Sequence, residues 1–393
     1  MKRILECFLL ILIFSFAINA QSVMNNIEDQ ILEVKNTFAP DKRTAIFDVH
    51  VAEDSGSYVL TGETNLTNAL IFLMNKLSPL TIKDEVKKLP DENLGGKNWG
   101  IINISVANIR TKPEHSAEMA TQALLGTIVK LYKKTDDGWY LVQTPDDYIS
   151  WVDGDAIERV KKGEADDWKN AAKIIFTPNY GSAFENPLPK SGVVSDLVFG
   201  NLLKLSKTED DFYLVEFPDG RTAKIKKSEA ELFSDWAKNR QCTEENIIST
   251  AKKFMGIPYL WGGTSAKGLD CSGFTKTVYF ANGIVLPRDA SQQVFIGETI
   301  DTENGFSNLQ PGDLLFFGFS GSANRKERIT HVAIYLGDSE FIHASGRVRI
   351  NSFDKSKTNF SKHRLTTFIR AKRIVSSIGK NGVELIESNQ YYK

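Results

Sequence analysis

The sequence predicts a multidomain α+β protein in which helices and antiparallel sheets occupy separate parts of the chain. Three observations support this class: the length of 393 residues, a tandem repeat of short alternating strands, and a change near residue 240 to helices followed by strands. Because a domain usually takes about 150 residues, we expect several cores rather than one.

The composition excludes several classes of protein. Hydrophobic residues make up 41% and charged residues 25% of the chain, so neither a disordered protein nor a bundle of membrane helices is predicted. Lys and Arg number 48 against 49 for Asp and Glu, which gives a formal net charge of -1. Without an excess of positive charge, we expect no nucleic-acid partner.

Residues 1–20 are predicted to be a signal peptide. Lys2 and Arg3 precede an apolar run, Cys7–Ala17, and small residues follow as far as Ala20. The run is shorter than the roughly 20 residues that span a bilayer, and its cysteine does not follow it as in a lipoprotein. We therefore predict cleavage near residue 20, no stable membrane anchor, and a periplasmic or extracellular location.

Residues 21–97 are predicted to form a small α+β N-terminal domain. Ile27, Ile31 and Val34 recur at helical spacing, and the residues from 47 to 51 alternate as in a strand. No chemistry is visible in this part, and its role stays open.

Residues 98–162 and 168–234 are predicted to be two small β barrels in tandem. LLGTIVKLYKKTDDGWYLVQTPDDYISWV in the first matches LVFGNLLKLSKTEDDFYLVEFPDGRTAKI in the second, with Gly126 aligned to Gly200. Short alternating strands broken by Asp-rich turns are typical of such barrels. Both copies resemble bacterial SH3-like domains. Only the first ends in DDYISWV, so we assign the second a structural role.

Residues 240–376 are predicted to form the domain that carries the chemistry, with helices first and an antiparallel sheet after them. Thr243 caps the first of its helices, and a second helix begins at Cys271. Residues 377–393 are predicted to be a C-terminal tail, polar and frayed from Glu387 onward.

Cys271 is the candidate nucleophile. It lies in the first turn of its helix, where unpaired N–H groups and the helix dipole favour an anion. We therefore expect its thiol to ionise more easily than at the free pKa of about 8.5. For an isolated helical cysteine a buried structural role is the more common interpretation.

Two histidines favour the catalytic interpretation. His331 begins one strand and His343 lies in the next, with the turn Gly337–Asp338 between them. In an antiparallel hairpin this spacing places the two residues opposite or diagonal to each other, so the imidazoles can touch. Such a set supplies a nucleophile, a base and a residue that orients the base.

Six ordered motifs then resemble one family, the NlpC-type cell-wall cysteine peptidases, over residues 243–372. They are PYLWGG, LDCSGF, LPRDASQQ, LQPGDLLFF, HVAIYLG and FIHASG. The resemblance implies a papain-like catalytic fold with helices packed on an antiparallel sheet. It implies four catalytic residues: Cys271 as nucleophile, His331 as base, His343 as the third polar residue and Tyr259 assisting the oxyanion.

The whole architecture is similar to one branch of that family, the γ-D-glutamyl-L-diamino acid endopeptidases, also called dipeptidyl-peptidase VI. This resemblance implies that a free N-terminal L-Ala amine is bound by Asp270, Ser272, Glu118 and Tyr148. Plainer roles compete for three of them: Asp270 as helix cap, Glu118 as a solvated charge and Tyr148 as barrel core. For Arg288 we favour a structural role over binding of a substrate carboxylate.

The resemblance implies hydrolysis of the γ-D-glutamyl-L-diamino acid bond in peptidoglycan stem peptides. We further expect a monomer that needs no cofactor. Three alternatives stay open. Cys271, His331 and His343 could bind zinc, the chain could be a non-catalytic cell-wall binding protein, or the same scaffold could carry out acyl transfer. The sequence does not distinguish diaminopimelate from lysine as the diamino acid.

Overall fold

The computed structural model describes residues 22–393 with three short internal gaps. The gaps are residues 55–56, 187–191 and 323–324. The predicted signal peptide, residues 1–20, lies outside the described residues. Among the helices that the structure describes, none is long and apolar enough to cross a membrane.

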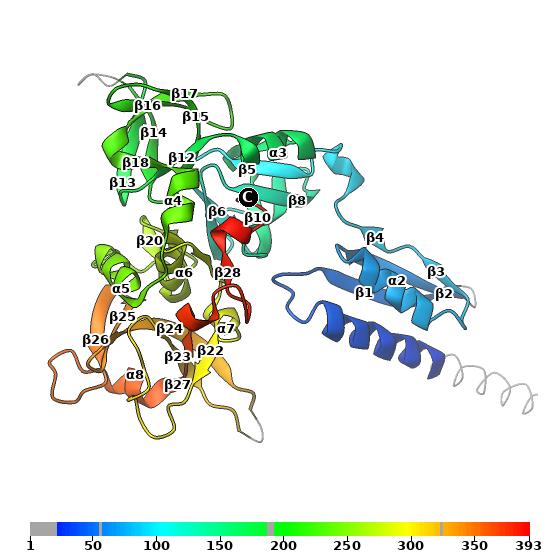
Figure 1. Cartoon of the computed structure of the whole chain (residues 1–393). Helices are drawn as coiled ribbons and strands as arrows, with labels where there is room; N and C mark the ends of the chain where they lie inside the picture. The colour runs from blue at the N-terminus through cyan, green and yellow to red at the C-terminus, as the bar shows by residue number, and fades with distance from the viewer. Residues whose placement is uncertain (1–21, 55–56, 187–191, 323–324) are drawn as a thin grey trace, which may run out of the picture. The chain divides into compact units, whose positions relative to one another are not determined.

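The chain separates into two compact units, residues 1–94 and 95–393. In the first unit a helix over residues 22–38 and the helix α2 (Thr67–Lys76) share one hydrophobic core with a sheet. The strands of that sheet are β1 (Phe47–Asp54), β2 (Ser57–Thr64), β3 (Ile82–Asp84) and β4 (Lys87–Lys88). β1 pairs antiparallel with β2, and β3 and β4 pair parallel with β2 (Figure 1). This unit is α+β, as predicted.

Two β modules open the second unit. The first β module contains β5 (Trp99–Ile102), β6 (Val106–Arg110), β7 (Met119–Leu124), β8 (Ile128–Lys134), β9 (Trp139–Gln143), β10 (Ile149–Asp153) and β11 (Ile157–Val160). The second β module contains β12 (Lys173–Phe176), β13 (Tyr180–Phe184), β14 (Val193–Val198), β15 (Leu202–Thr208), β16 (Phe212–Glu216), β17 (Thr222–Lys226) and β18 (Ala230–Leu232). The helices α3 (Lys162–Asn170) and α4 (Phe233–Asn239) follow the first and second module respectively.

The two modules have the same topology. Their strand orders are β11-β5-β8-β9-β10-β6-β7 and β18-β12-β15-β16-β17-β13-β14, so every described strand of one has a counterpart in the other. The aligned glycines, Gly126 and Gly200, both adopt positive φ angles, 80° and 91°. Each of these glycines lies in a turn that packs against the other module. Between the two turns, the N–H of Leu202 donates to the carbonyl oxygen of Leu125. The repeat that the sequence predicts is therefore present in the fold.

The C-terminal domain, from α5 to β27, packs helices against a sheet. Its helices are α5 (Glu244–Lys253), α6 (Cys271–Ala281), α7 (Ala290–Gln293) and α8 (Lys362–Thr367). The sheet has the order β22-β27-β23-β24-β25-β26. Its strands are β22 (Glu298–Ile300), β23 (Leu314–Phe319), β24 (Arg328–Gly337), β25 (Glu340–Ser345), β26 (Arg347–Ser352) and β27 (Phe368–Arg373).

Two short ladders complete this domain. One joins β19 (Thr264–Ser265) to β20 (Gly268–Leu269), and the other joins β21 (Ile284–Val285) to β28 (Glu384–Leu385). The core lies between α5, α6 and the sheet, where Ile247, Phe274, Val278 and Ile334 are fully buried. The arrangement of helices on an antiparallel sheet agrees with the predicted fold class, whereas the exact domain limits stay a prediction.

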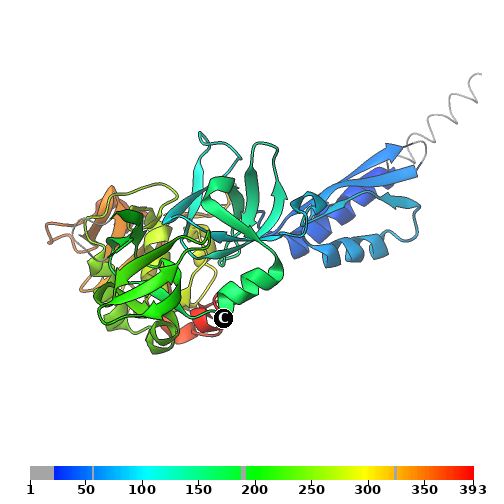
Figure 2. The same ribbon diagram turned by 90° about the horizontal axis from the view of Figure 1, so that it is seen from above.

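The end of the chain is packed rather than frayed, which corrects the sequence-based expectation. Asn389 and Tyr391 are 3% and 5% exposed, and the Tyr391 ring lies 6.0 Å from that of Trp99 in the first β module. Tyr392 contacts Phe233 at 6.1 Å between ring centroids. Both views show the C-terminus near α3, the helix that follows the first β module (Figure 1, Figure 2). The expectation rested on the polar composition of this segment and overlooked Tyr391 and Tyr392, whose rings can bury large apolar areas.

Candidate active site

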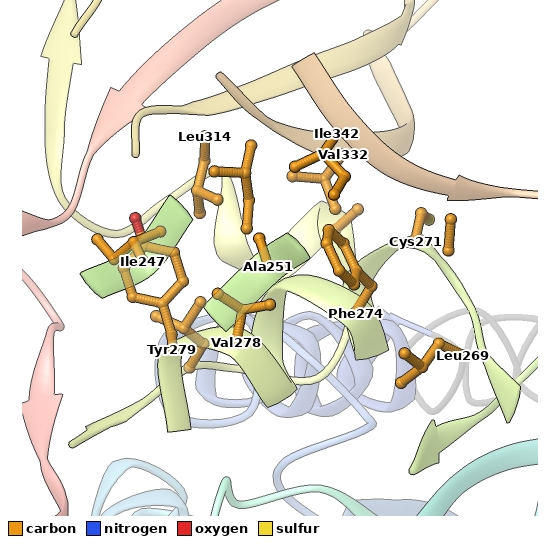
Figure 3. Close-up of a cluster of buried hydrophobic side chains, with 14 of the residues drawn as sticks. Ile247, Ala251, Leu269, Cys271, Phe274, Val278, Tyr279, Leu314, Val332 and Ile342 are labelled. Carbon is orange, nitrogen blue, oxygen red and sulfur yellow. The ribbon is translucent and has the colours of Figure 1, made fainter. Parts of the chain in front are cut away.

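The candidate nucleophile is the first residue of α6. Asp270 caps this helix, because its Oδ1 atom accepts a hydrogen bond of 2.7 Å from the N–H of Gly273. The Cys271 side chain is 7% exposed and belongs to the hydrophobic cluster that α6 forms with β24 and β25 (Figure 3). The backbone N–H groups of Ser272 and Val332 favour the charged form of this thiol, although burial outweighs them. The start of the helix thus brings the thiol against β24.

The thiol is not the easily ionised group that the sequence predicts. Burial, together with the negative charge of Asp270, raises the pKa of the Cys271 thiol to about 12. The start of α6 does favour an anion, but the cap carboxylate opposes that effect, and the buried surroundings disfavour any charge. The resting site therefore holds a neutral thiol, and its proton must leave during the reaction.

The two histidines form a hydrogen-bonded pair. β24 and β25 pair with Ile334 opposite Ile342, a register that places His331 diagonal to His343. The Nε2 atom of His331 lies 2.8 Å from the Nδ1 atom of His343, and the ring planes meet at 87°. The predicted contact between the imidazoles is confirmed.

Asn351 on β26 fixes where the protons of this pair lie. Its Nδ2 donates to the carbonyl oxygen of Asn359 at 2.8 Å, so its Oδ1 atom faces Nε2 of His343 at 2.9 Å as an acceptor. His343 then carries its proton on Nε2 and accepts the Nε2–H of His331 on Nδ1. The Nδ1 atom of His331 is left unprotonated, which is the state required of a base.

Both imidazoles are neutral at neutral pH. Burial, with additional repulsion from Arg364, lowers the pKa of His331 well below its ordinary value. Burial also lowers the pKa of His343 to about 3, although its hydrogen bond to Asn351 favours the charged form. The directions of these shifts favour the uncharged forms, so the resting site holds a neutral thiol and a neutral imidazole pair.

This state predicts a steep pH dependence for alkylation of Cys271. We expect the rate of reaction with iodoacetamide to rise about tenfold per pH unit from about pH 6 to pH 9, because the thiolate fraction grows at that rate below a raised pKa. Mass spectrometry of the peptide that contains Cys271 separates this reaction from that of Cys242, whose pKa burial also raises to about 12. A rate already constant between about pH 5 and pH 8 would reveal a preformed thiolate.

Tyr259 and the start of α6 offer two hydrogen-bond donors. Tyr259 is half-buried and is anchored by its N–H, which donates to the carbonyl oxygen of Gly346 at 3.0 Å. Burial and the neighbouring Cys271 raise the pKa of its phenol, so the hydroxyl keeps its proton. Within the described residues, neither this hydroxyl nor the N–H of Cys271 donates to another group. Both can therefore receive a developing oxyanion.

Asp270 and Ser272, on either side of the thiol, bind a buried arginine. Arg288 is 1% exposed, and its Nη2 atom lies 2.5 Å from Oδ2 of Asp270. Its Nη1 donates to the hydroxyl of Ser272 and its Nε to the hydroxyl of Thr121 in β7, each at 2.9 Å. Arg288 thus links α6 to the first β module, which supports the structural role favoured for it.

Glu118 and Tyr148 both reach the C-terminal domain from the first β module. Glu118 is exposed, and its Oε1 atom accepts a hydrogen bond of 2.7 Å from the indole N–H of Trp261. Tyr148 is 8% exposed, and its hydroxyl donates to Oδ2 of Asp289 at 3.3 Å. Tyr148 is therefore buried, as expected of a barrel-core tyrosine, and it also contacts the C-terminal domain.

Sequence reasoning missed three residues of this site. Asp289 and Trp261 lie inside the motifs LPRDASQQ and PYLWGG, so a local signal for them existed. Asn351 lies outside every motif, and only the pairing of β25 with β26 brings it to His343.

The zinc alternative finds no support in this geometry. The Nε2 atom of His331 and the Nδ1 atom of His343 point at each other across 2.8 Å, which leaves no room for an ion between them. In the part of the chain that the structure describes, no group of three His, Cys, Asp or Glu side chains is arranged to hold a metal ion.

Two parts of the chain match known families. Residues 256–370 match the NlpC/P60 family, and residues 109–157 match the bacterial dipeptidyl-peptidase Sh3 domain. The gamma-D-glutamyl-L-lysine dipeptidyl-peptidase of Bacillus cereus is 32% identical over 235 residues, which cover 58% of this chain and 67% of that protein. The chain belongs to the NlpC/P60 family. It is accordingly a cysteine peptidase with an SH3 domain.

Further NlpC/P60 relatives extend the similarity. The dipeptidyl-peptidase 6 of Lysinibacillus sphaericus is 25% identical over 275 residues, or 68% of this chain and 96% of that protein. A solved NlpC/P60 family protein from Bacillus cereus covers 70% of this chain and 99% of its own, with 25% identity and a TM-score of 0.60. Both matches are longer than the NlpC/P60 domain alone, so they extend beyond it.

Proposed function

We propose that this protein hydrolyses the bond between γ-D-glutamate and a diamino acid in peptidoglycan stem peptides. The proposal rests chiefly on Cys271 and on the hydrogen-bonded chain of His331, His343 and Asn351. These residues lie in an NlpC/P60 domain that is joined to a dipeptidyl-peptidase SH3 domain. The relative from Bacillus cereus is named for this bond, with lysine as the diamino acid.

Acylation begins with proton transfer from the thiol to His331. The Nδ1 atom of His331 takes the proton as the sulfur of Cys271 attacks the scissile carbonyl carbon. The N–H of Cys271 and the hydroxyl of Tyr259 donate to the oxyanion. His343, held by Asn351, accepts the Nε2–H of the new imidazolium and stabilises it.

The leaving amine and water complete the reaction. His331 returns its proton to the nitrogen of the diamino acid, the C–N bond breaks, and a thioester remains on Cys271. Neutral His331 then takes a proton from water, which attacks the thioester carbonyl. The sulfur leaves and is protonated again by His331, so the site returns to its neutral resting state.

We assign binding of a free N-terminal L-Ala amine to Glu118, Tyr148, Asp270 and Ser272. A buried ammonium needs carboxylate partners to replace its hydration. The charge of Asp270 is already compensated by Arg288, whereas Glu118 forms no ion pair with any described residue. Glu118 therefore supplies the negative charge that attracts the amine and disfavours stems whose alanine is attached to sugar.

The test compares L-Ala-γ-D-Glu-diamino acid peptides with free and with N-acetylated alanine, using mass spectrometry of the products. We expect the free peptide to be cleaved with a kcat/KM at least about tenfold higher, because the ammonium forms charge-assisted hydrogen bonds. Glu118→Gln is expected to remove most of this preference, while Glu114→Gln, an exposed charge on the same loop, leaves it intact. Equal cleavage of both peptides by the wild type contradicts the assignment.

We also propose that the protein is exported and acts outside the cytoplasm as a monomer without a cofactor. The basic start and apolar run of residues 1–20 support export. Peptidoglycan fragments are the partner that the NlpC/P60 family implies.

A further inference from the structure

Arg364 on α8 lies beside the proposed base. Its guanidinium is 5.4 Å from the ring centroid of Phe317 on β23. Phe317 is in turn the cross-strand partner of His331, with their ring centroids 5.7 Å apart. One aromatic ring therefore contacts both the arginine and the histidine. Burial is the largest cause that lowers the pKa of His331, and the charge of Arg364 is the second largest.

The guanidinium of Arg364 forms no ion pair with any acidic residue that the structure describes. It is half-buried, and burial lowers its pKa from the ordinary value. Within the described residues it forms neither an ion pair nor a side-chain hydrogen bond. Arg373 is also half-buried, but its charge is compensated by Asp313, which it binds through two hydrogen bonds of 2.8 Å. A partly desolvated guanidinium without a carboxylate is costly unless a ligand supplies one.

The chemistry places the leaving residue next to His331, the imidazole on which the charge of Arg364 acts. His331 protonates the leaving nitrogen, so the diamino acid that carries this nitrogen must lie next to His331. The dipeptide portion extends the other way, toward Asp270 and Glu118 at the first β module. The charge of Arg364 acts on both His331 and Cys271, so this guanidinium is a candidate contact for the diamino acid.

We propose that Arg364 binds the carboxylate at the far end of a diaminopimelate side chain and so selects diaminopimelate over lysine as the leaving residue. This inference rests on the proposed function. Diaminopimelate carries a carboxylate beside its distant amine, whereas lysine carries the amine alone. A planar guanidinium can bind that carboxylate through two hydrogen bonds and repels an isolated ammonium. Arg349, exposed and opposite His343, adds positive charge to the same region.

The experiment uses the full chain and three peptides of the form L-Ala-γ-D-Glu-X. X is meso-diaminopimelate, meso-diaminopimelate with the distal carboxyl amidated, or L-lysine. For the wild type we expect kcat/KM to be about tenfold higher for the free diaminopimelate peptide than for either of the others, the effect of one charge-assisted pair. The comparison with the amidated peptide needs no variant, so it does not depend on the folding of a mutant.

Variants then test whether the preference for diaminopimelate depends on Arg364. Arg364→Gln should lower kcat/KM about tenfold for the diaminopimelate peptide alone, and Arg364→Lys should retain part of the preference. Lys362→Gln removes the same charge from another face of α8 and should keep the wild-type ratio.

Two outcomes would overturn the inference while leaving the proposed function intact. The first is equal cleavage of the free and amidated diaminopimelate peptides by the wild type. The second is an equal loss on all three peptides in Arg364→Gln, which would indicate a structural role or binding of the carboxylate of D-glutamate. Failure of the wild type to cleave any of the peptides would instead overturn the proposed function, and this inference with it.

Discussion

Cys271→Ala is expected to abolish hydrolysis of L-Ala-γ-D-Glu-diamino acid peptides, with kcat/KM reduced at least about ten thousandfold. The thiol is the attacking group, and the hydroxyl next to it cannot replace it. Ser272 donates to Asp270 at 3.2 Å and accepts from Arg288 at 2.9 Å, so its oxygen is held in the Asp270–Arg288 network. Product formation followed by mass spectrometry gives the measurement.

Two controls separate loss of chemistry from loss of folding. Cys242→Ala removes the other buried cysteine and should leave kcat unchanged. The thermal unfolding midpoint of Cys271→Ala should stay close to that of the wild type, because only one sulfur atom is lost from the edge of a large hydrophobic cluster. Turnover by Cys271→Ala at the wild-type rate would refute the assigned nucleophile.

His331→Ala is expected to lower kcat about a thousandfold with little change in KM, because general-base catalysis of this kind contributes two to four orders of magnitude. The raised pKa of the Cys271 thiol makes the base indispensable, since almost no thiolate forms without it at neutral pH. Single-turnover kinetics separate the loss in the acylation step from any change in binding.

A matched variant tests whether the effect belongs to this imidazole. His363→Gln removes an exposed histidine of α8 and is expected to keep kcat within about twofold of the wild type. If His331→Ala retained most of its activity at neutral pH, the thiol would have to ionise without this base. The neutral resting state described above would then be wrong.

The sequence was sufficient where the contacts are local or carried by a regular element. The spacing of His331 and His343 across one tight turn predicted their contact, because an antiparallel ladder determines which residues meet. The tandem repeat predicted two modules, and their described strands have the same order. The helix that begins at Cys271 was also predicted correctly, and Asp270 caps it in the structure.

The sequence failed where burial or distant pairing decides the outcome. Easy ionisation of Cys271 was predicted from the helix dipole alone, whereas burial and the Asp270 carboxylate raise its pKa. Asn351 reaches His343 only through the register of β25 and β26, which no motif encodes. The packing of Tyr391 against Trp99 joins the two ends of the second unit, and local composition carries no signal for such a contact.

The central claim, that Cys271 carries the acyl group during turnover, is tested most directly by trapping the intermediate. The enzyme is mixed with L-Ala-γ-D-Glu-diaminopimelate, quenched in acid within the first turnovers and analysed by mass spectrometry after digestion. We predict an added L-Ala-γ-D-Glu acyl group on the peptide that contains Cys271, and its absence in Cys271→Ala. An acyl group on a different residue, with Cys271 unmodified, would contradict the account.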